Sequence, residues 1–453
     1  MENTKKNLWI AAGVLMAVKF IFHLAFNGGY GYFRGEFYYI ECARNLAWGY
    51  VDHPPLAMFI TRISLELFGD SLFAIRLLPA LAGAATVGVI AATVIMLNGG
   101  MLALLLAGIG YITTPAAMGI GNYLSMNIYD HLFIAVWVYY FLKLLQTEDM
   151  KYWLHLGVVT GVAMMNKYTL VFYLGFILLL MAIGKERKYL VTKQFLSLCG
   201  IAFAIFLPHI IWQAVNGWPT LEFMRNAALY KNASMSIAGF LTAAAMDLSP
   251  LNFALIFSAG IMLLTDNEMK RYRTLLTGFF AVVLFFSLTN GKVYYLAAYL
   301  GGVLALSSVI VERVLRTALL KKAGYAIVVL MTLAGIFIAP LAVAVLSPEK
   351  YIQYADAMGI APSTGERKEL GPLPQHFADM FGWQELTDAV HEAYQRLTEE
   401  EKKSAIIFGQ NYGEAGAVAV LGKKYNLPRV VSGHNNYFLW GAGTDSIGTV
   451  III

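Results

Sequence analysis

Charged residues are scarce in this chain of 453 residues. Asp, Glu, Lys and Arg make up 13% of it, whereas a soluble domain carries about 25%. This shortage excludes an ordinary soluble enzyme. The hydrophobic fraction is 58% and the mean hydropathy is +0.62, and these values indicate an integral protein with many membrane spans.

Cysteine is rarer still, and Cys42 and Cys199 are its two occurrences. They lie far apart in the sequence, one near a predicted membrane surface and the other inside a hydrophobic run. This placement argues against a disulfide framework. A dense basic segment is also missing. The net charge of +5 follows from short basic loops, so no nucleic-acid partner is predicted.

Long hydrophobic runs fill most of the first 346 residues. A bilayer core about 30 Å thick needs about 20 helical residues to cross it. The first run follows a short basic head and lacks a small-residue cleavage site, so we expect a retained span and not a signal peptide. In all we predict eleven spans, near residues 7–26, 71–97, 100–117, 128–146, 152–166, 168–184, 191–211, 250–265, 273–289, 293–311 and 323–346.

The loops between these runs predict the orientation of the chain. If the N-terminus is cytoplasmic, four of the five inner loops carry Lys or Arg, which agrees with the positive-inside rule. An odd number of spans then leaves the C-terminal region outside. We therefore expect a multi-pass protein of the cytoplasmic (inner) membrane, with residues 1–346 as its membrane domain.

The composition changes after residue 346, where charged and polar residues become as frequent as in soluble proteins. Patterns typical of strands and helices then alternate, which predicts a small extracytoplasmic α/β domain over 347–453. We expect its apolar end, "VIII", to be a buried strand. The predicted elements are helices over 383–397 and 414–425 and strands over 404–410, 428–433 and 447–453.

Ionisable residues gather in the first outer loop, residues 27–70. Helical spacing on both sides of "GYVDHPP" predicts two amphipathic helices on the outer membrane surface, with Pro54 and Pro55 in the first turn of the second. An interfacial anchor with snorkelling charges is one interpretation. It does not explain why Asp52 and His53 stand directly before a rigid Pro-Pro corner.

Three more ionisable residues lie near the predicted outer ends of spans, namely Asp130, Lys167 and Lys292. Outer lysines bind phosphate well as point charges, although snorkelling to lipid headgroups explains either lysine equally well by itself. Carboxylates can act as general bases, and cations can stabilise a departing phosphate. The combination favours group transfer from a lipid phosphate.

A multi-span lipid or solute transporter is the alternative from another class. A transporter is expected to place ionisable residues at mid-bilayer on broken helices. Mid-span charges are few here, namely Lys19, His23 and Arg76. The outer carboxylates and histidines have no spacing diagnostic of a metal site. The sequence therefore leaves open whether a divalent cation binds, and no other cofactor is predicted.

Six stretches carry a resemblance to a known family. They are, in order, "EFYYIECARNLAWGYVDHPPL", "SMNIYDHLF", "GVAMMNKYTLVF", "PHIIWQAVNGWPTLEF", "GKVYYLAAY" and "NYGEAGAVAVLG…LPRVVSGHNNYFLWG". In these stretches the chain resembles the bacterial and archaeal branch of the protein O-mannosyltransferase/ArnT-like superfamily. The resemblance covers almost the whole chain, and its specificity lies in the combination of stretches. The superfamily consists of GT-C glycosyltransferases that use polyprenyl-phosphate sugars, so the resemblance implies a GT-C membrane fold.

The resemblance implies an inverting hexosyl- or pentosyltransferase with an extracytoplasmic active site. Its partners would be a polyprenyl-phosphate sugar in the bilayer and an acceptor hydroxyl of a protein, a glycolipid or a cell-wall glycan. An acidic residue of the first loop would deprotonate the acceptor, and basic residues would hold the phosphate. The candidates are Glu36, Asp52 and Asp130 for catalysis, Arg34, His53, Lys167 and Lys292 for the donor phosphate, and Tyr412, Glu414 and His434 for acceptor contact or closure of the cavity.

The chain departs from the superfamily in the first-loop signature. The expected Asp-Glu pair reads Gly35-Glu36 here, so the Asp that relatives use as the base is missing. Three interpretations remain: Glu36 is the base, Asp52 or Asp130 is the base, or the protein binds a lipid-linked sugar without transferring it. For Glu414, a favourable position at a helix start is the simpler explanation.

Overall fold

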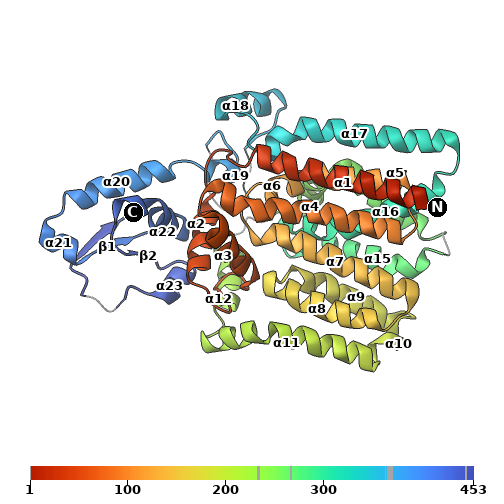
Figure 1. Cartoon of the computed structure of the whole chain (residues 1–453), viewed down its shortest axis with the longest axis horizontal. Coiled ribbons are helices and arrows are strands. Elements are labelled where there is room, and N and C mark those ends of the chain that lie inside the picture. Colours follow the sequence, from red (N-terminus) through yellow and green to blue (C-terminus); the bar gives the residue numbers. More distant parts are fainter. Residues whose placement is uncertain (1, 232–234, 266–267, 363, 365–370, 444–445) are drawn as a thin grey trace.

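The computed structural model describes residues 2–231, 235–265, 268–362, 364, 371–443 and 446–453. It consists of a bundle of long helices and a smaller domain attached to one end of that bundle (Figure 1). The N-terminus lies at the opposite end of the bundle, and the C-terminus lies in the smaller domain (Figure 1).

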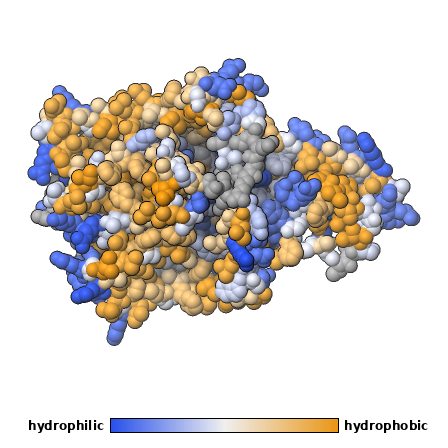
Figure 2. All heavy atoms as spheres, turned by 180° about the vertical axis from the view of Figure 1, so that it is seen from behind, coloured by the Kyte–Doolittle hydropathy of each residue, from blue (hydrophilic) through white to orange (hydrophobic). Residues whose placement is uncertain are grey.

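Within the described ranges, 7 helical segments are long and apolar enough to cross a membrane, or 8 if the bent pair α13 (Ile237–Asp247) and α14 (Pro250–Met262) is one span. The chain is therefore a multi-pass membrane protein. Apolar side chains dominate the visible face of the bundle (Figure 2). The seven segments contain α1 (Glu2–Ala25), α4 (Leu72–Met96), α7 (Met126–Thr147), α11 (Lys193–Val215), α15 (Arg273–Leu288), α16 (Ala297–Val314) and α17 (Ala318–Ala342).

Every predicted run coincides with helix, but some of the helices are shorter than a span requires. Residues 100–117 form α5 (Met101–Ile112) and α6 (Pro115–Ile120). The break arises because Pro115 has no N–H and disfavours helical backbone in the residue before it. Two further short helices are α8 (Lys151–Asn166) and α9 (Thr169–Ile183). The number of eleven spans therefore stays a prediction.

The centre of the bundle is α16, which is the most buried of the spanning helices. A Cβ atom at Gly302 would lie 2.5 Å from the Val138 side chain of α7, so glycine permits this close approach. Peripheral helices such as α11 and α17 have mostly exposed apolar side chains, as expected for surfaces that face lipid. Cys42 and Cys199 are both free, which confirms that they form no disulfide.

The first outer loop contains α2 (Arg34–Arg44) and α3 (Leu56–Phe68), so both predicted helices form. They lie at the end of the bundle that carries the smaller domain (Figure 1). The expected surface position is wrong for α2, most of whose residues are buried. It packs against α3 and against α22 (Tyr412–Leu421) of the smaller domain, because apolar residues lie on more than one of its faces.

The smaller domain has the predicted alternation of strands and helices. Its parallel sheet has the order β2-β1-β3, and Val390, Ile407 and Val418 pack together beside it. The last strand forms, but the expectation that it is buried is wrong. It is an outer strand, and Val450 and Ile452 are 46% and 68% exposed because alternate residues point away from the core. The elements are α20 (Trp383–Gln395), α22, β1 (Ala405–Phe408), β2 (Val430–Val431) and β3 (Thr449–Ile452).

Candidate active site

Glu36 is enclosed beside Arg76 of α4. Its Oε1 accepts hydrogen bonds from Arg76 Nε at 2.8 Å and from the Leu124 N–H at 2.7 Å. Its Oε2 accepts from Arg76 Nη2 at 2.6 Å and from the Phe33 N–H at 2.8 Å. The Glu36 side chain is 0% exposed. With both oxygens engaged and no access to solvent, Glu36 is suited to hold the loop, and this geometry argues against a role as base.

Asp52 and His53 form the corner between α2 and α3. The Tyr38 hydroxyl donates to Asp52 Oδ1 at 2.8 Å, and the Asp52 side chain remains 14% exposed. His53 Nδ1 donates to the Pro54 carbonyl at 2.8 Å. Its Nε2 lies 3.9 Å from Asp52 Oδ1 and has no hydrogen-bond partner among the described residues. Asp52 is therefore a first-loop carboxylate that a substrate can reach, with an imidazole beside it.

Tyrosines lie around this corner. Burial raises the pKa of Tyr39 well above its usual value, and the nearby charge of Asp52 adds to the shift. Tyr39 and Tyr123 both lie near Tyr294, at the beginning of the α16 segment. A phenol with a raised pKa stays protonated at neutral pH, so it can donate a hydrogen bond as well as accept one. We call Tyr39, Tyr123 and Tyr294 the tyrosine cluster.

Lys167 lies beside the tyrosine cluster, in the turn between α8 and α9. Its Nζ is 5.6 Å from the centre of the Tyr294 ring and 4.2 Å from that of Tyr295. Burial lowers the pKa of Lys167 to about 8, whereas the Asp130 carboxylate acts in the opposite direction and the Lys292 ammonium in the same direction. The cation therefore faces aromatic rings, and its side chain is partly exposed.

Asp130 lies close enough to Lys167 for their opposite charges to interact. It is fully buried, and neither carboxylate oxygen has a hydrogen-bond partner among the described residues. Asn127, one turn earlier on α7, accepts a hydrogen bond from Lys167 Nζ at 2.7 Å. Lys292 caps the short helix that precedes α16 and lies near Lys167. The structure thus brings together three predicted residues, namely Asp130, Lys167 and Lys292.

Arg34 lies apart from these lysines, at the junction with the C-terminal domain. Its guanidinium is 3.3 Å from Asp379 Oδ2 and 5.5 Å from the centre of the Tyr412 ring. The Tyr412 ring neighbours those of Tyr38 and His434, at 5.3 and 5.1 Å. Tyr412 and His434 therefore close one side of the first-loop corner, and the position of Arg34 favours a bridging role over phosphate binding.

Glu414 has a local structural role at the start of α22. The Asn411 N–H donates to Glu414 Oε2 at 3.2 Å, and Asn411 Oδ1 accepts from the N–H groups of Gly413 and Glu414 at 2.8 and 3.2 Å. This reciprocal pattern is a capping box, which satisfies N–H groups at a helix start. Glu414 therefore contacts the start of its own helix, which agrees with the favourable helix-start position expected from the sequence.

His209 is a site residue that the sequence prediction missed. Its Nδ1 donates to the Trp48 carbonyl of the first loop at 2.9 Å, and its Nε2 accepts from the Tyr168 hydroxyl at 2.6 Å. Tyr168 adjoins Lys167, so His209 joins the first loop to the lysine side of the site. The signal available in the sequence was a histidine inside the apolar run 191–211.

The acidic residues near the corner do not gather around a common point. Glu36 is bound to Arg76, whereas Asp130 lies beside Lys167. Within the described ranges, no three His, Cys, Asp or Glu side chains are placed to hold one metal ion. Cationic side chains balance the two acids instead.

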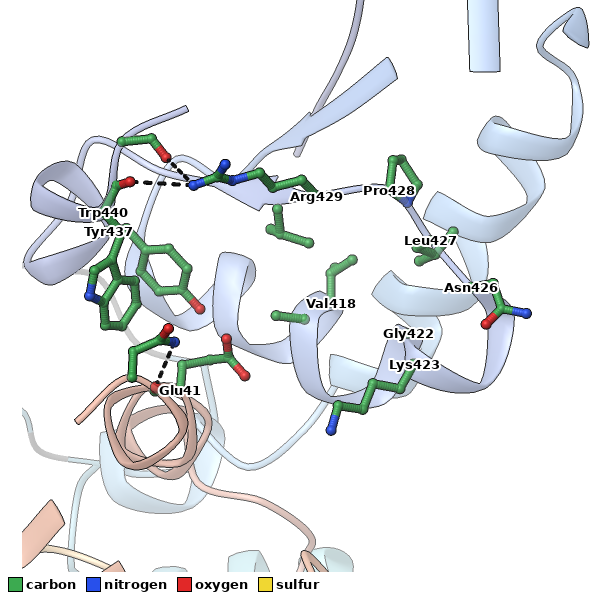
Figure 3. Close-up of a pocket in the computed structure, with 14 residues that line it drawn as sticks. Glu41, Val418, Gly422, Lys423, Asn426, Leu427, Pro428, Arg429, Tyr437 and Trp440 are labelled. Atoms are coloured by element: carbon green, nitrogen blue, oxygen red, sulfur yellow. Dashed lines mark hydrogen bonds between the residues drawn. The ribbon is translucent and has the colours of Figure 1, made fainter. Parts of the chain in front are cut away.

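A cavity of about 440 Å³ opens between α2 and the C-terminal domain (Figure 3). Glu41 of α2 lines one side, and Tyr437 and Trp440 of α23 (Asn436–Trp440) line another. None of the predicted site residues lines this cavity. The helix α2 lies between this cavity and the site, so the two are neighbours.

A model of the family described as dolichyl-phosphate-mannose-protein mannosyltransferase matches residues 52–212. Two solved structures of ArnT from Cupriavidus metallidurans, one bound to undecaprenyl phosphate and one in the apo state, match with a TM-score of 0.62 and 16% identity each. Each match covers 94% of this chain and 85% of the ArnT chain. The chain has the ArnT fold.

The ArnT fold confirms the predicted GT-C class, with its helical membrane bundle and small C-terminal α/β domain. The family match independently confirms the predicted resemblance, over a range that starts at Asp52 and includes Asp130 and Lys167. A sequence comparison with curated proteins finds no match. The family match indicates the superfamily that the sequence stretches indicated, and the ArnT structures show the fold.

Proposed function

We propose that the chain transfers a monosaccharide from a polyprenyl-phosphate donor to an acceptor hydroxyl, with inversion at the anomeric carbon. The acceptor belongs to a protein, a glycolipid or a cell-wall glycan, and the reaction takes place on the extracytoplasmic side. The observation that carries the proposal is that the tyrosine cluster has Asp52 near Tyr39 and Lys167 near Tyr294. The family match and the ArnT fold, known in a complex of ArnT with undecaprenyl phosphate, support it.

Asp52 is the proposed base. Tyr38 holds one of its oxygens, and the side chain keeps some exposure. The carboxylate removes the proton of the acceptor hydroxyl while that oxygen bonds to the anomeric carbon. The bond from this carbon to the phosphate oxygen breaks in the same step, and the phosphate leaves with the electron pair. Glu36 is less suited to this step because its two oxygens already accept four hydrogen bonds.

Lys167 and Lys292 are the proposed phosphate-binding residues. Negative charge grows on the lipid phosphate as its bond to the sugar breaks, and a nearby ammonium stabilises this charge strongly where water is excluded. The Asp130 carboxylate favours the charged form of Lys167. His53 is a further candidate contact for the phosphate, because its Nε2 has no hydrogen-bond partner among the described residues.

The transporter alternative has one observation in its favour. The helices α13 and α14 meet at 105°, and broken helices are typical of transporters. The ionisable residues, however, concentrate at the end of the bundle beside the first loop. Of the mid-span charges, Arg76 is already paired with Glu36. This distribution favours transfer at a membrane surface over passage through the bilayer.

A donor panel tests the proposal. Purified protein is incubated with labelled polyprenyl-phosphate sugars and membrane extract, and we expect one donor to be consumed with release of polyprenyl phosphate. Asp52→Asn should lower the rate by about 10²–10⁴-fold because general-base catalysis is lost. The matched control is Asp356→Asn, at an exposed position of α18 (Pro348–Ala357), and should keep the rate. Donor binding without consumption would instead identify a non-catalytic binder, and failure to bind any donor would overturn the proposal.

A further inference from the structure

The cavity between α2 and the C-terminal domain has the chemistry of a carbohydrate site. Its volume of about 440 Å³ lies within the range of about 300–1,000 Å³ usual for small-molecule sites. Within the described structure it is lined by aromatic rings on one side and by a carboxylate and amide groups on others, including Glu41, Asn45 and Asn426. A sugar ring needs both kinds of surface, because its C–H faces are apolar and its rim carries hydroxyls.

The aromatic side of the cavity is a corner made by α23. The rings of Tyr437 and Trp440 stand 4.9 Å apart at 75° to each other. Two such planes can cover a flat apolar face and the edge next to it. Figure 3 shows both rings beside the open space, opposite Val418. The backbone of this corner is held by Arg429, whose Nη2 donates to the carbonyls of Trp440 and Gly441 at 3.3 and 3.0 Å.

The polar groups of the cavity are suited to hydroxyl groups. The Glu41 carboxylate points toward the open space in Figure 3, and Arg44 occupies one of its oxygens, at 2.6 Å. The Tyr437 hydroxyl lies near Glu41 and has no hydrogen-bond partner among the described residues, although the side chain is 96% buried. A buried hydroxyl without a partner costs stability, so a ligand that supplies the missing bond is favoured there. The cavity wall also carries Lys423 and Arg429, so charged groups of both signs line it.

The cavity is coupled to the proposed reaction centre by hydrogen bonds. Asn436, the first residue of α23, accepts from the Val51 N–H at 3.1 Å and donates through its own N–H to the Tyr38 hydroxyl at 3.4 Å. The same Tyr38 hydroxyl donates to Asp52 at 2.8 Å. A ligand that contacts α23 is therefore linked to the proposed base, Asp52, through Asn436 and Tyr38.

We propose that this cavity binds a hydroxyl-rich sugar unit of the acceptor, with Trp440 as the stacking surface and Glu41 and Tyr437 as hydroxyl partners. The assignment of the sugar to the acceptor rests on the proposed glycosyl transfer. The binding of a sugar does not, because it depends on the cavity alone. The acceptor is then a glycan or glycolipid, and an unmodified protein is disfavoured.

Binding to the full chain in lipid nanodiscs, without donor, tests this inference. The probes are methyl glycosides of mannose, glucose and N-acetylglucosamine and their disaccharides, measured by saturation-transfer NMR and calorimetry. We expect at least one to bind. Trp440→Ala should weaken it by at least about tenfold and Tyr437→Phe by about three- to tenfold, as for one lost hydrogen bond. Tyr437→Phe removes a hydroxyl that has no partner in the described protein, so it should leave the melting temperature unchanged.

Phe438→Ala is the matched control, because Phe438 lies on the same helix and is 70% exposed. It should change sugar affinity by less than about twofold, as expected of a surface substitution. No binding of any sugar, equal binding by the Trp440→Ala variant, or preferential binding of a serine-containing peptide would overturn the inference. If a sugar binds but none of the labelled polyprenyl-phosphate sugars is consumed, the result would contradict the proposed function and leave the cavity assignment intact.

Discussion

Glu36 carries its charge inside the protein, and Arg76 is its counter-ion. Removing one partner of a buried ion pair leaves the other uncompensated and costs about 3–5 kcal/mol. We therefore expect Glu36→Gln to lower the apparent melting temperature in detergent and to reduce transfer only as far as folded protein is lost. Thermal unfolding, together with the rate per folded molecule, measures this.

Glu66→Gln is the control for that experiment. Glu66 pairs with Arg62 on the exposed side of α3, where an ion pair contributes little. This variant should keep the melting temperature of the parent. A Glu36→Gln protein with full stability and no transfer would mean that Glu36 is the base after all.

The lowered pKa of Lys167 predicts a pH dependence of donor binding. Below its pKa of about 8 the side chain is charged and attracts phosphate, and above that value it becomes neutral. Affinity for a polyprenyl phosphate should therefore fall as the pH rises through about 8. In Lys167→Arg the charge persists to high pH, so the fall near pH 8 should disappear.

Titration of donor binding between pH 6 and 10 gives the comparison. Lys188→Arg, at an exposed lysine far from the site, should keep the parental profile. If Lys167→Arg also retained the loss near pH 8, another group would be responsible and Lys167 would not bind the phosphate.

The sequence carries clearer signals for some candidate site residues than for others, for physical reasons. Lys167 and Lys292 stand in turns between apolar runs, so their expected side of the membrane follows from the order of the runs. The pairing of Glu36 did not follow, because its partner lies 40 residues away in a different helix. A signal was present: an arginine such as Arg76 inside an apolar run usually has a partner.

At the scale of elements, the contact between α2 and α22 joins the first loop to the C-terminal domain. A Cβ atom at Gly416 would lie 2.8 Å from Phe37 Cβ and 3.2 Å from the Tyr38 backbone nitrogen. Overpacking of this kind costs about 1–3 kcal/mol. We expect Gly416→Ala to loosen the domain, which limited proteolysis should detect as faster cleavage after α17, and to slow transfer.

Gly433→Ala serves as the control, since nothing lies within 4 Å of a Cβ atom built there. It should leave cleavage and transfer unchanged. If Gly416→Ala behaved in the same way, the close packing of α22 on α2 would have no part in the activity.

Elements were predictable to different degrees. The helices α20 and α22 and the three strands of the C-terminal domain followed from local periodicity, and so did the positions of all the apolar runs, whereas α18 and α23 were not predicted. Burial did not follow, because it depends on neighbours far away in sequence. For this reason α2 was expected at a membrane surface and "VIII" in a core, although the first is enclosed by α22 and the second is an outer strand.

At the scale of the whole molecule, the N-terminus and the C-terminal domain lie at opposite ends of the bundle (Figure 1). If the N-terminus is cytoplasmic, as the loops predict, this arrangement places the C-terminal domain outside the cytoplasm. In a Cys199→Ser background, Lys424→Cys should react with a membrane-impermeant maleimide in intact cells. Lys188→Cys, in the short helix α10 (Arg187–Leu190) before α11, should react only after the membrane is opened. The reverse pattern would contradict the orientation and the proposed side of the reaction.

The contacts of Arg76 have a consequence for the order in which the chain matures. Its guanidinium binds Glu36 and the carbonyls of Asn27 and Gly31, so the start of the first loop is arranged around a residue of the helix that follows it. A ribosome completes this loop before it makes α4. The loop therefore cannot reach its final shape when it first crosses the membrane, and it must wait until α4 is inserted. The corner at Asp52 belongs to that loop, so the proposed catalytic surface would form late, after the second long helix is in place.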